Sequence, residues 1–478
     1  MEQGQSRHED QVALCIDLDG TLLRSDVLYE SVLALLSKNP LYLFLLPFWL
    51  MRGKAALKHE IAARVDLDAT TLPYDERVVE LLSTTKTRPR VLCTATNGKY
   101  ATAIAEHLGV FDLVMASDES RNLSGKRKAD MLVERFGEGR FDYAGNEDCD
   151  LKVWERARAA WVVNASGSLA QRAARISRLD QHLPASRAGL KTWLKAIRLH
   201  QWLKNLLVFV PLLASHRFLE VGTLATTLAA FVAFGLCASG VYVLNDLLDL
   251  PSDRVHPRKR KRPFAAGSLP LLHGLAAAPL LTLAGFALAI AVGWPFAVVL
   301  LGYYAMTLAY SLRLKRVVMV DVVLLAGLYT IRIIGGTVAI DAGLSFWLLA
   351  FSMFLFLSLA MLKRYTELAI MLASGQDKAS GRGYTVEDLP LIQSMGAASG
   401  YCAVLVFALY INSPESLELY RRPQLLWLIC PLLLYWISRV WVKAHRGMMD
   451  DDPVVFAVTD RVSQVVIALC GLMILGAI

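Results

Sequence analysis

Residues 243–267 read VLNDLLDLPSDRVHPRKRKRPFAAG and combine three aspartates with a run of five cations, directly after a long apolar segment. Asp246, Asp249 and Asp253 are spaced three and four residues apart, which places their side chains on one face of a helix. Pro251 interrupts this pattern, because a helix usually ends or kinks before a proline. We therefore expect either one acidic helical face or an acidic cluster split by a turn.

Three neighbouring carboxylates repel one another, so this stretch predicts a bound cation. Mg²⁺ binds one or two carboxylates together with phosphate oxygens, which makes a Mg²⁺-bridged diphosphate the expected ligand. Lys259 and Arg262 are positioned to hold its outer oxygens. The alternative is that the acids pair only with the adjacent cations at a headgroup surface.

The chain around this stretch is a polytopic membrane protein by composition. Of its 478 residues 55% are hydrophobic and the mean hydropathy is +0.42, values that are high for a soluble protein. About nine apolar runs have the ~17–25 residues that a bilayer core requires. They lie at 200–216, 220–245, 271–292, 294–312, 317–340, 345–362, 393–411, 425–442 and 462–478.

The loops after alternate runs carry most of the cations of this half, which predicts that those loops are cytoplasmic. We therefore expect a multi-pass inner (cell) membrane protein whose N-terminal half and active sites face the cytoplasm. The seven cysteines form no CxxC pair, which argues against zinc or a disulfide framework and suits a reducing compartment. The polar N-terminus predicts no cleaved signal peptide, and we expect the lipid bilayer, but no nucleic acid, as a partner.

Asn245 to Asp253, with RVHPRKRKRP after it, resembles the NDxxDxxxD signature of the UbiA superfamily of membrane transferases. The resemblance covers residues ~190–478 and implies an all-helical membrane domain. It also implies that Asp246, Asp249 and Asp253 hold Mg²⁺ on a diphosphate leaving group, with Asn245 beside it.

The second family motif is altered in this chain. Asp321 is present, but Leu325 stands where aromatic-acceptor members have the second acid of DxxxD. Together with HQWLKNLLVFVPLL (200–213) and LAMLKRYTEL (359–368), this pattern is similar to the branch that includes decaprenyl-phosphate phosphoribosyltransferase. That branch uses the phosphoribosyl diphosphate PRPP as donor and a polyprenyl phosphate as acceptor.

The acceptor of that branch is itself an anion, so the resemblance implies a second set of phosphate-binding residues beside the metal ligand Asp321. The candidates are Tyr310, Lys315, Arg332, Lys363 and Arg364. Lys363 and Arg364 also fit a purely topological role at a membrane surface. Arg332 lies well inside an apolar run, where an unpaired charge costs several kcal/mol, and this favours a site or an ion pair.

The last polar loop contains Asp450–Asp452 and then Asp460-Arg461. These residues fit a third anion and metal element, or a solvated turn followed by a helix N-cap. The sequence slightly favours the solvated turn.

Residues 11–26, QVALCIDLDGTLLRSD, form an apolar strand followed by Asp17 and Asp19. Carboxylates at the carboxyl end of a parallel strand lie at the usual ligand edge of an α/β sheet. There one can act as a phosphoryl-accepting nucleophile and the other as an acid or base. Thr94 ends a later strand, and Lys128 starts a helix.

Asn146 and Asp150 follow a third strand. This order resembles the haloacid dehalogenase (HAD) superfamily over residues ~11–175. The resemblance implies that Asp17 is the nucleophile, Asp19 the acid/base, and Thr94 and Lys128 phosphate binders. It also implies Mg²⁺ held by Asp17, Asp19, Asn146 and Asp150. Asn146 stands where the family usually has aspartate, and a degenerate, purely structural domain is the alternative.

We therefore expect a two-part chain, with an N-terminal α/β Rossmann-like domain at 1–180, an amphipathic basic linker at 181–199 and a helical membrane domain at 200–478. A helical insert at about 28–75 occupies the position of a cap. Its apolar run followed by cations suits a membrane surface or, equally, a buried cap core.

The combined hypothesis is a bifunctional enzyme: phosphoribosyl transfer to a polyprenyl phosphate, then removal of the 5-phosphate by the α/β domain. The alternative is prenyl transfer from a prenyl diphosphate to an aromatic or other acceptor. A membrane-tethered scaffold that only binds is the non-enzymatic alternative.

Overall fold

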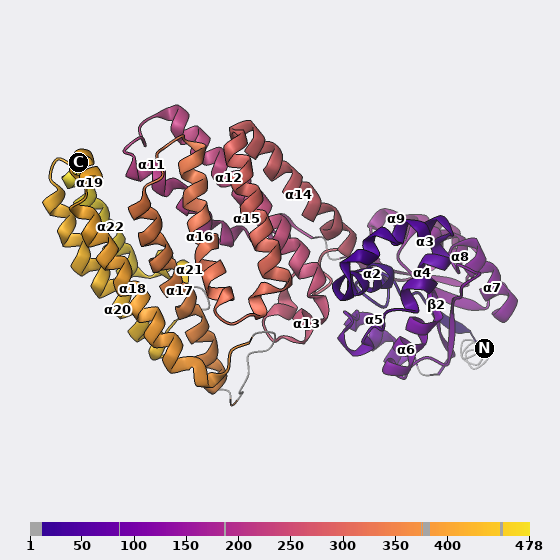
Figure 1. Cartoon of the computed structure of the whole chain (residues 1–478). Coiled ribbons are helices and arrows are strands. Elements are labelled where there is room, and N and C mark those ends of the chain that lie inside the picture. Colours follow the sequence, from indigo (N-terminus) through magenta and orange to yellow (C-terminus); the bar gives the residue numbers. More distant parts are fainter. Residues whose placement is uncertain (1–11, 86, 186–187, 374, 376–382, 450–452) are drawn as a thin grey trace. The chain divides into compact units, whose positions relative to one another are not determined.

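The computed structural model describes residues 12–85, 87–185, 188–373, 375, 383–449 and 453–478. The chain divides into two compact units (Figure 1). We call residues 1–197 with 242–279 the α/β unit, and residues 198–241 with 280–478 the helical unit. The expected linear division at 180 and 199 stays a prediction, and the observed units differ from it by placing 242–279 with the N-terminal residues.

The α/β unit is built on six parallel strands in the order β3-β2-β1-β4-β5-β6. The strands are β1 Ala13–Ile16, β2 Arg90–Asn97, β3 Leu113–Ser117, β4 Phe141–Gly145, β5 Ala159–Ala165 and β6 Arg178–Pro184. Because β1 has β2 on one side and β4 on the other, the chain reverses its winding direction there. Ligand sites of such sheets lie at this switch point, beyond the carboxyl ends of the strands. The predicted α/β architecture is confirmed.

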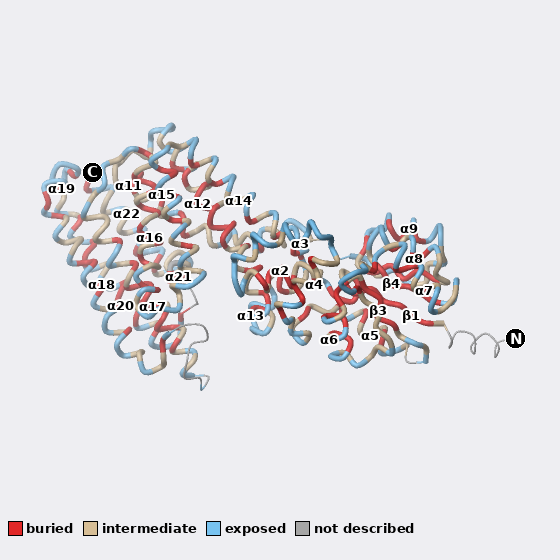
Figure 2. The backbone as a smooth tube through the Cα atoms, turned by 45° about the vertical axis from the view of Figure 1, so that its right-hand side comes forward, coloured by how far each residue is buried: buried red, intermediate tan, exposed pale blue. Residues whose placement is uncertain are grey.

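Helices cover both faces of this sheet because alternate residues of each strand point to opposite sides. Leu14 and Ile16 of β1 belong to one buried cluster, and Ala13 and Cys15 belong to the other. The first cluster includes α5 (Glu76–Thr84) and α6 (Gly98–Leu108), and the second α7 (Lys126–Phe136), α8 (Leu151–Trp154) and α9 (Gly167–Ile176). The four central strands are correspondingly buried (Figure 2), whereas the edge strands β3 and β6 are more exposed.

The insert after β1 is helical, as expected. It comprises α2 Val27–Lys38, η1 Pro40–Phe44, α3 Leu46–Met51, α4 Lys54–Ala62 and η2 Ala69–Thr71. It has a small core of its own, made by Leu35, Trp49, Leu57, Ile61 and Val65. The start of the expected linker is part of the sheet, because β6 extends to Pro184, and the short helix α10 (Leu190–Ala196) follows.

The remaining elements are helical. They are η3 Asp148–Asp150, η4 Leu199–Phe209, α11 Val210–Ala214, α12 Val221–Leu248, α13 Leu250–Val255, η5 Lys259–Lys261, α14 Leu271–Val292, α15 Trp294–Leu312, η6 Leu314–Arg316, α16 Val320–Ala339, α17 Phe346–Ala373, η7 Val386–Asp388, α18 Leu389–Ile411, α19 Pro414–Leu419, η8 Pro423–Leu428, α20 Ile429–His445, α21 Pro453–Thr459 and α22 Arg461–Ala477.

Within the described ranges, seven helices are long and apolar enough to cross a membrane, and they make this an integral membrane protein. The expected count of about nine is not confirmed. The first expected span is broken into the 3-10 helix η4 and the short α11, after Arg198 adopts a left-handed φ of 50°. The last, α22, has 17 residues. Both are shorter apolar helices.

Candidate functional sites

Asp17 follows β1 at the switch point of the sheet, and its carboxylate binds a buried lysine. Asp17 Oδ1 accepts a hydrogen bond from Lys128 Nζ at 2.9 Å and another from the Leu18 amide at 2.9 Å. Lys128 lies on α7 and is 2% exposed. Burial raises the pKa of Asp17, while the Lys128 ammonium opposes that rise. The structure thus brings together the predicted nucleophile and the predicted phosphate-binding cation.

Asp19 accepts hydrogen bonds from two donors, and its pKa is raised. Its Oδ2 accepts from Thr96 Oγ1 at 2.6 Å and its Oδ1 from the Val27 amide at 2.8 Å. Burial, and secondarily the charge of Asp26, raises the pKa of Asp19 to about 6. A carboxyl group with a pKa near neutrality can hold a proton and donate it to a leaving group.

Asp150 lies behind Lys128 and is joined to it through a tyrosine. Lys128 Nζ donates to Tyr143 OH at 2.7 Å, and Tyr143 OH donates to Asp150 Oδ1 at 3.0 Å. Asp150 Oδ2 accepts the amides of Asn146 and Glu147, each at 3.0 Å. Both oxygens of Asp150 therefore have protein donors, an arrangement that positions Lys128 and the loop after β4. The sequence motif did not identify Tyr143, although it lies one strand away from Asp17.

Asn146 directly follows β4, whereas Thr94, expected at the end of a strand, lies within β2, which continues to Asn97. Asn146 Oδ1 accepts from Thr21 Oγ1 at 3.2 Å, and the buried Thr94 Oγ1 accepts from the Thr96 amide at 3.0 Å. Gly20 has a φ of 72°, and a Cβ there would lie 2.1 Å from Asn146 Nδ2. Only glycine therefore fits between the two loops that carry Asp19 and Asn146.

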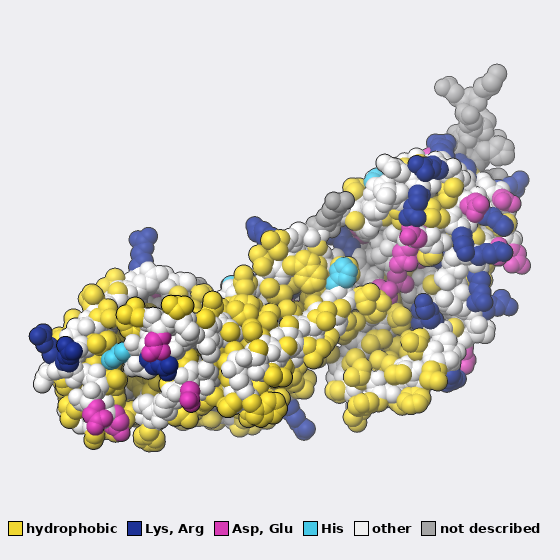
Figure 3. Space-filling view, turned by 90° about the horizontal axis from the view of Figure 1, so that it is seen from above, with side chains coloured by type: hydrophobic (Ala, Val, Ile, Leu, Met, Phe, Trp, Pro, Cys, Tyr) yellow, Lys and Arg dark blue, Asp and Glu magenta, His cyan; other side chains and the backbone are white. Residues whose placement is uncertain are grey.

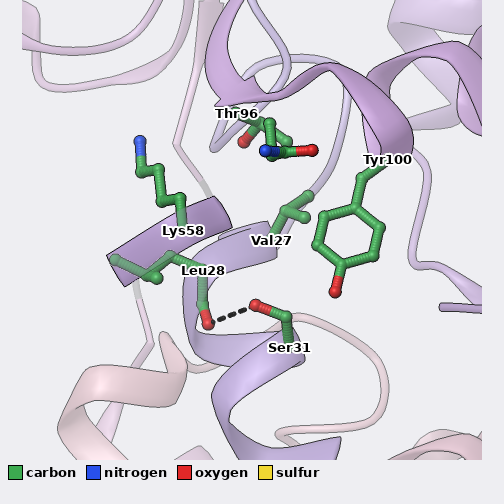
Figure 4. A pocket seen from close by; sticks show the side chains of 7 residues that line it. Val27, Leu28, Ser31, Lys58, Thr96 and Tyr100 are labelled. Atoms are coloured by element: carbon green, nitrogen blue, oxygen red, sulfur yellow. Dashed lines mark hydrogen bonds between the residues drawn. The ribbon is translucent and has the colours of Figure 1, made fainter. Parts of the chain in front are cut away.

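A small cleft beside Asp19 brings in a residue that the sequence did not predict (Figure 4). Its lining residues are Val27, Leu28, Ser31, Lys58, Thr96, Asn97 and Tyr100. Lys58 comes from the insert helix α4, and its Nζ donates to the Ala95 carbonyl at 2.6 Å. Burial lowers the pKa of Lys58, whereas the negative charge of Asp19 opposes this. A cation that the insert brings to this cleft suits the binding of an anionic substrate.

The aspartates of 243–267 form a second site, and α12 ends at Leu248, before Pro251, as the sequence predicted. The Asp249 amide donates to the Asn245 carbonyl and the Asp253 amide to the Asp249 carbonyl, each at 2.9 Å. Pro251 is in the first turn of α13, where a missing N–H leaves no bond unmade. Asp249, with φ −96° and ψ 10°, separates the two helices, so the acidic cluster is split by a turn, although hydrogen bonds of helical spacing flank that turn.

Asp246 and Asp253 share one guanidinium. Arg262 Nη1 lies 3.1 Å from Asp246 Oδ1 and 2.5 Å from Asp253 Oδ2, and both carboxylates are at most 2% exposed. Asp249 is half-buried, whereas Lys259 is exposed on η5. Arg262 thus pairs with the acids themselves, as in the alternative of acids paired with adjacent cations. The predicted contacts of Arg262 and of the exposed Lys259 with a diphosphate stay predictions.

The carboxylate of Asp253 has spare binding capacity. Its Oδ1 is buried and has no hydrogen-bond partner within the described residues. A buried acceptor without a donor costs about 1–3 kcal/mol, more for a charged group, so such an atom suits a ligand.

The two sites offer different oxygen donors to a metal ion. Within the described ranges, no group of three or more His, Cys, Asp and Glu side chains is arranged to hold a metal ion. Mg²⁺ needs fewer, since it binds one or two carboxylates and completes its shell with phosphate oxygens and water. Asp246 and Asp253 fit that requirement, and Asp253 supplies the open oxygen. In the α/β site, the oxygens that would bind Mg²⁺ are those of the Asp17 carboxylate and the side-chain carbonyl of Asn146.

In the helical unit, Asp321 is bound by an arginine and a tyrosine. Its Oδ2 accepts from Arg364 Nε at 2.5 Å and its Oδ1 from Tyr384 OH at 2.6 Å. Arg364 also reaches Tyr310 OH at 3.0 Å and Glu367 Oε2 at 2.5 Å. Asp321 and Arg364 are both at most 1% exposed. Asp321 therefore neutralises Arg364, and its predicted role as a metal ligand stays a prediction.

Arg332 is a second buried cation of the helical unit. Its guanidinium donates to Asn205 Oδ1 at 2.8 Å and to Tyr303 OH at 3.0 Å. Its central carbon lies 4.8 Å from the centre of the Tyr303 ring and 5.8 Å from that of Tyr329. Arg332 is thus held by an amide and two aromatic rings, which attract a cation without neutralising it.

The other predicted residues of this unit are less buried. Lys315 on η6 and Lys363 on α17 are half-buried. Asp460 caps α22 by accepting the Ser463 amide at 2.9 Å and pairs with Arg439 at 2.8 Å, which agrees with the N-cap interpretation. Asp450–Asp452 lie outside the described residues.

Known proteins match both the membrane half and the full length of the chain. An uncharacterized protein, y4nM of Sinorhizobium fredii, is 36% identical over 96% of this chain and 90% of its own length. The nodulation protein NoeC of Azorhizobium caulinodans is 36% identical over 59% of this chain and 92% of its own. Decaprenyl-phosphate phosphoribosyltransferase of Mycolicibacterium smegmatis is 32% identical over 57% and 87%, respectively. Residues 206–459, more than half of the chain, match the UbiA prenyltransferase family, and the chain therefore belongs to that family.

Proposed function

We propose that the membrane part of the chain transfers the phosphoribosyl group of PRPP to a polyprenyl phosphate. The observation that carries this proposal is the pair Asp246 and Asp253 on one guanidinium, with a buried carboxylate oxygen of Asp253 left open. Such a pair suits Mg²⁺ on a diphosphate leaving group. The similarity to a relative named decaprenyl-phosphate phosphoribosyltransferase supports the choice of donor and acceptor.

The reaction needs positioning and charge neutralisation more than proton transfer. An oxygen of the polyprenyl phosphate attacks the anomeric carbon of PRPP, and the bond from that carbon to the diphosphate breaks. The attacking oxygen is already ionised, so no general base is required. Mg²⁺, held by Asp246 and Asp253, would supply charge neutralisation of the departing diphosphate, while Arg262 contacts the same carboxylates from the protein side.

The α/β unit then removes the 5-phosphate of the lipid-linked ribose in our proposal. Asp17 attacks the phosphorus, the ribose oxygen leaves with a proton from Asp19, and water hydrolyses the aspartyl phosphate. Lys128, 2.9 Å from Asp17, neutralises the phosphate, and Lys58 supplies a second cation from the cap. The products are polyprenyl-phosphoryl-ribose and inorganic phosphate.

A prenyl diphosphate donor with an aromatic or other acceptor is the second candidate, favoured by the general activity of the family. The buried cation Arg332 of the helical unit, held by an amide and two aromatic rings, argues for the phosphate acceptor, because an aromatic acceptor brings no second anion to balance it. We further propose that both sites face the cytoplasm, since the cations that follow alternate spans predict cytoplasmic loops.

A doubly labelled donor tests both steps in one reaction. Membranes containing the full chain are incubated with polyprenyl phosphate and PRPP that carries ¹⁴C in the ribose and ³²P in the 5-phosphate. Extracted lipid is expected to gain ¹⁴C and then lose ³²P as inorganic phosphate, and chelation of Mg²⁺ is expected to abolish both labels.

Two variants separate the steps. Asp17→Asn is expected to accumulate lipid that keeps both labels, and Asp253→Asn to give no labelled lipid. If the unchanged chain labels no lipid from PRPP but does so from a radioactive prenyl diphosphate and an aromatic acceptor, the phosphoribosyl assignment is wrong. If Asp17→Asn releases ³²P at the normal rate, the phosphatase assignment is wrong.

A further inference from the structure

The segment Pro40–Met51 of the insert exposes a dense set of apolar side chains. Seven of its large hydrophobic residues are between 43% and 85% exposed: Leu41, Leu43, Phe44, Leu45, Phe48, Leu50 and Met51. On the α/β half, whose surface otherwise carries many charged side chains, hydrophobic side chains form a continuous patch (Figure 3). Contiguous exposed apolar surface of this kind marks an interaction site in most proteins.

The segment is fixed to the fold by its other face. Tyr42 and Leu46 pack against the small core of the insert, and Trp49 belongs to that core and is 8% exposed. The Arg64 guanidinium covers the Trp49 ring at 4.8 Å from its centre. A buried cap core therefore accounts for three of the apolar residues, and the seven exposed ones are directed outward by a segment whose inner face is already packed.

The segment begins close to the end of a membrane helix. Ser37 Oγ donates to the carbonyl of Leu248 at 3.0 Å, and Leu248 is the last residue of α12, one of the seven helices able to cross a membrane. Both residues belong to the α/β unit. Pro40 follows Ser37 by three residues, which span at most about 11 Å. The apolar segment thus starts within about 11 Å of the end of this membrane helix, a distance comparable to the depth of the headgroup region, which adds about 5–8 Å to each side of the hydrocarbon core.

Cations follow the apolar residues directly. Arg52, which caps the end of α3 and lies 2.9 Å from Glu60, and Lys54, which begins α4, are both exposed. An apolar segment flanked by Lys and Arg binds the interface of a bilayer by burying its apolar side chains and attracting anionic headgroups.

We propose that Pro40–Met51 lies in the headgroup region of the bilayer that α12 crosses, with Phe44, Phe48 and Met51 inserted toward the acyl chains. The insert of the α/β unit is then a membrane-bound element, which holds the cleft of Lys58 at the lipid surface. This proposal does not depend on the reaction that either site performs.

Site-directed labelling of the full chain in lipid nanodiscs tests this. Cys149 and Cys402, the two exposed cysteines within the described residues, are first replaced by serine. A fluorophore is then attached at Phe44→Cys or Met51→Cys, and at Ser83→Cys on α5 as the matched control. Quenching by acyl-chain-brominated lipid and by aqueous iodide is compared between the positions.

Labels at 44 and 51 are expected to be quenched by brominated lipid and protected from iodide, and the label at 83 to show the reverse. Equal iodide quenching at 44, 51 and 83 would overturn the proposal. Protection in discs that hold two copies of the chain, but not in discs that hold one, would assign the segment to a contact between copies and overturn it as well.

Discussion

Glu30 of α2 and Arg254 of α13 form a buried ion pair whose disruption has a predictable cost. Arg254 Nη2 and Nη1 lie 2.5 and 3.1 Å from the two oxygens of Glu30, and the two side chains are 7% and 4% exposed. Arg254 Nε also donates to the Ala265 carbonyl at 3.1 Å. The pair joins two parts of the α/β unit, the helix that follows the Asp17 loop and the helix that contains Asp253.

Removal of one partner leaves the other charge buried without compensation. Breaking a buried pair in this way costs about 3–5 kcal/mol, so we expect Glu30→Gln to lower the unfolding free energy of the α/β unit by about that amount. Solvent screening reduces this cost only slightly, because both side chains are almost fully buried. In the double variant Glu30→Gln with Arg254→Gln neither charge remains, so its cost is expected to fall below the sum of the single costs by about 1.5 kcal/mol or more.

Pulse proteolysis of the full chain in detergent, over a urea series, measures this free energy through cleavage of the unfolded α/β unit. Asp130→Asn is the matched control, because Asp130 and Arg156 are 3.9 Å apart and both exposed. An exposed pair contributes about 0–1 kcal/mol. A Glu30→Gln cost no larger than that of Asp130→Asn, or single costs that simply add in the double variant, would refute the reasoning.

Three further predictions follow from single contacts. Lys58→Met is expected to lower kcat/KM of the proposed phosphatase reaction about ten- to a hundredfold, since a hydrogen bond to a charged group contributes about 1.5–3 kcal/mol. Lys58→Arg should restore part of it in a phosphate-release assay. Tyr143→Phe removes the hydroxyl that donates to Asp150; we expect about 1–3 kcal/mol lower stability of the α/β unit by pulse proteolysis. Tyr384→Phe removes a donor from the buried Asp321. We expect this to cost about 1–3 kcal/mol of stability and to lower the Tm of the detergent-solubilised chain by several °C. An unchanged Tm would contradict this prediction.

The sequence predicted the architecture because each half has a strong local signal. The apolar strand before Asp17 predicted the central parallel strand, and the acids after the strands predicted which side chains would meet at its edge. The count of membrane helices was less accurate, because hydropathy does not report backbone conformation. The segment at Leu199–Phe209 is apolar enough to resemble a span but is a 3-10 helix.

Contacts that join distant residues had no sequence signal. Glu30 and Arg254 are separated by 224 positions, and neither belongs to a motif that specifies the other. Lys58 lies in the helical insert, and no hydrophobic periodicity in the sequence predicts which face of that insert packs against the rest of the unit. The sequence assigned Asp321 to a metal ion and Arg364 to a phosphate or to the membrane surface, whereas the two side chains bind one another.

The discontinuity of the α/β unit has a consequence for biosynthesis. Arg254 is made roughly 60 residues after Ile197, and at about 5–20 residues per second this is a delay of about 3–12 s. Residues 198–241 of the helical unit, including most of α12, are translated within that interval. The ion pair between Glu30 and Arg254 therefore forms only after α12 has been synthesised, so the α/β unit is completed after translation of that membrane helix.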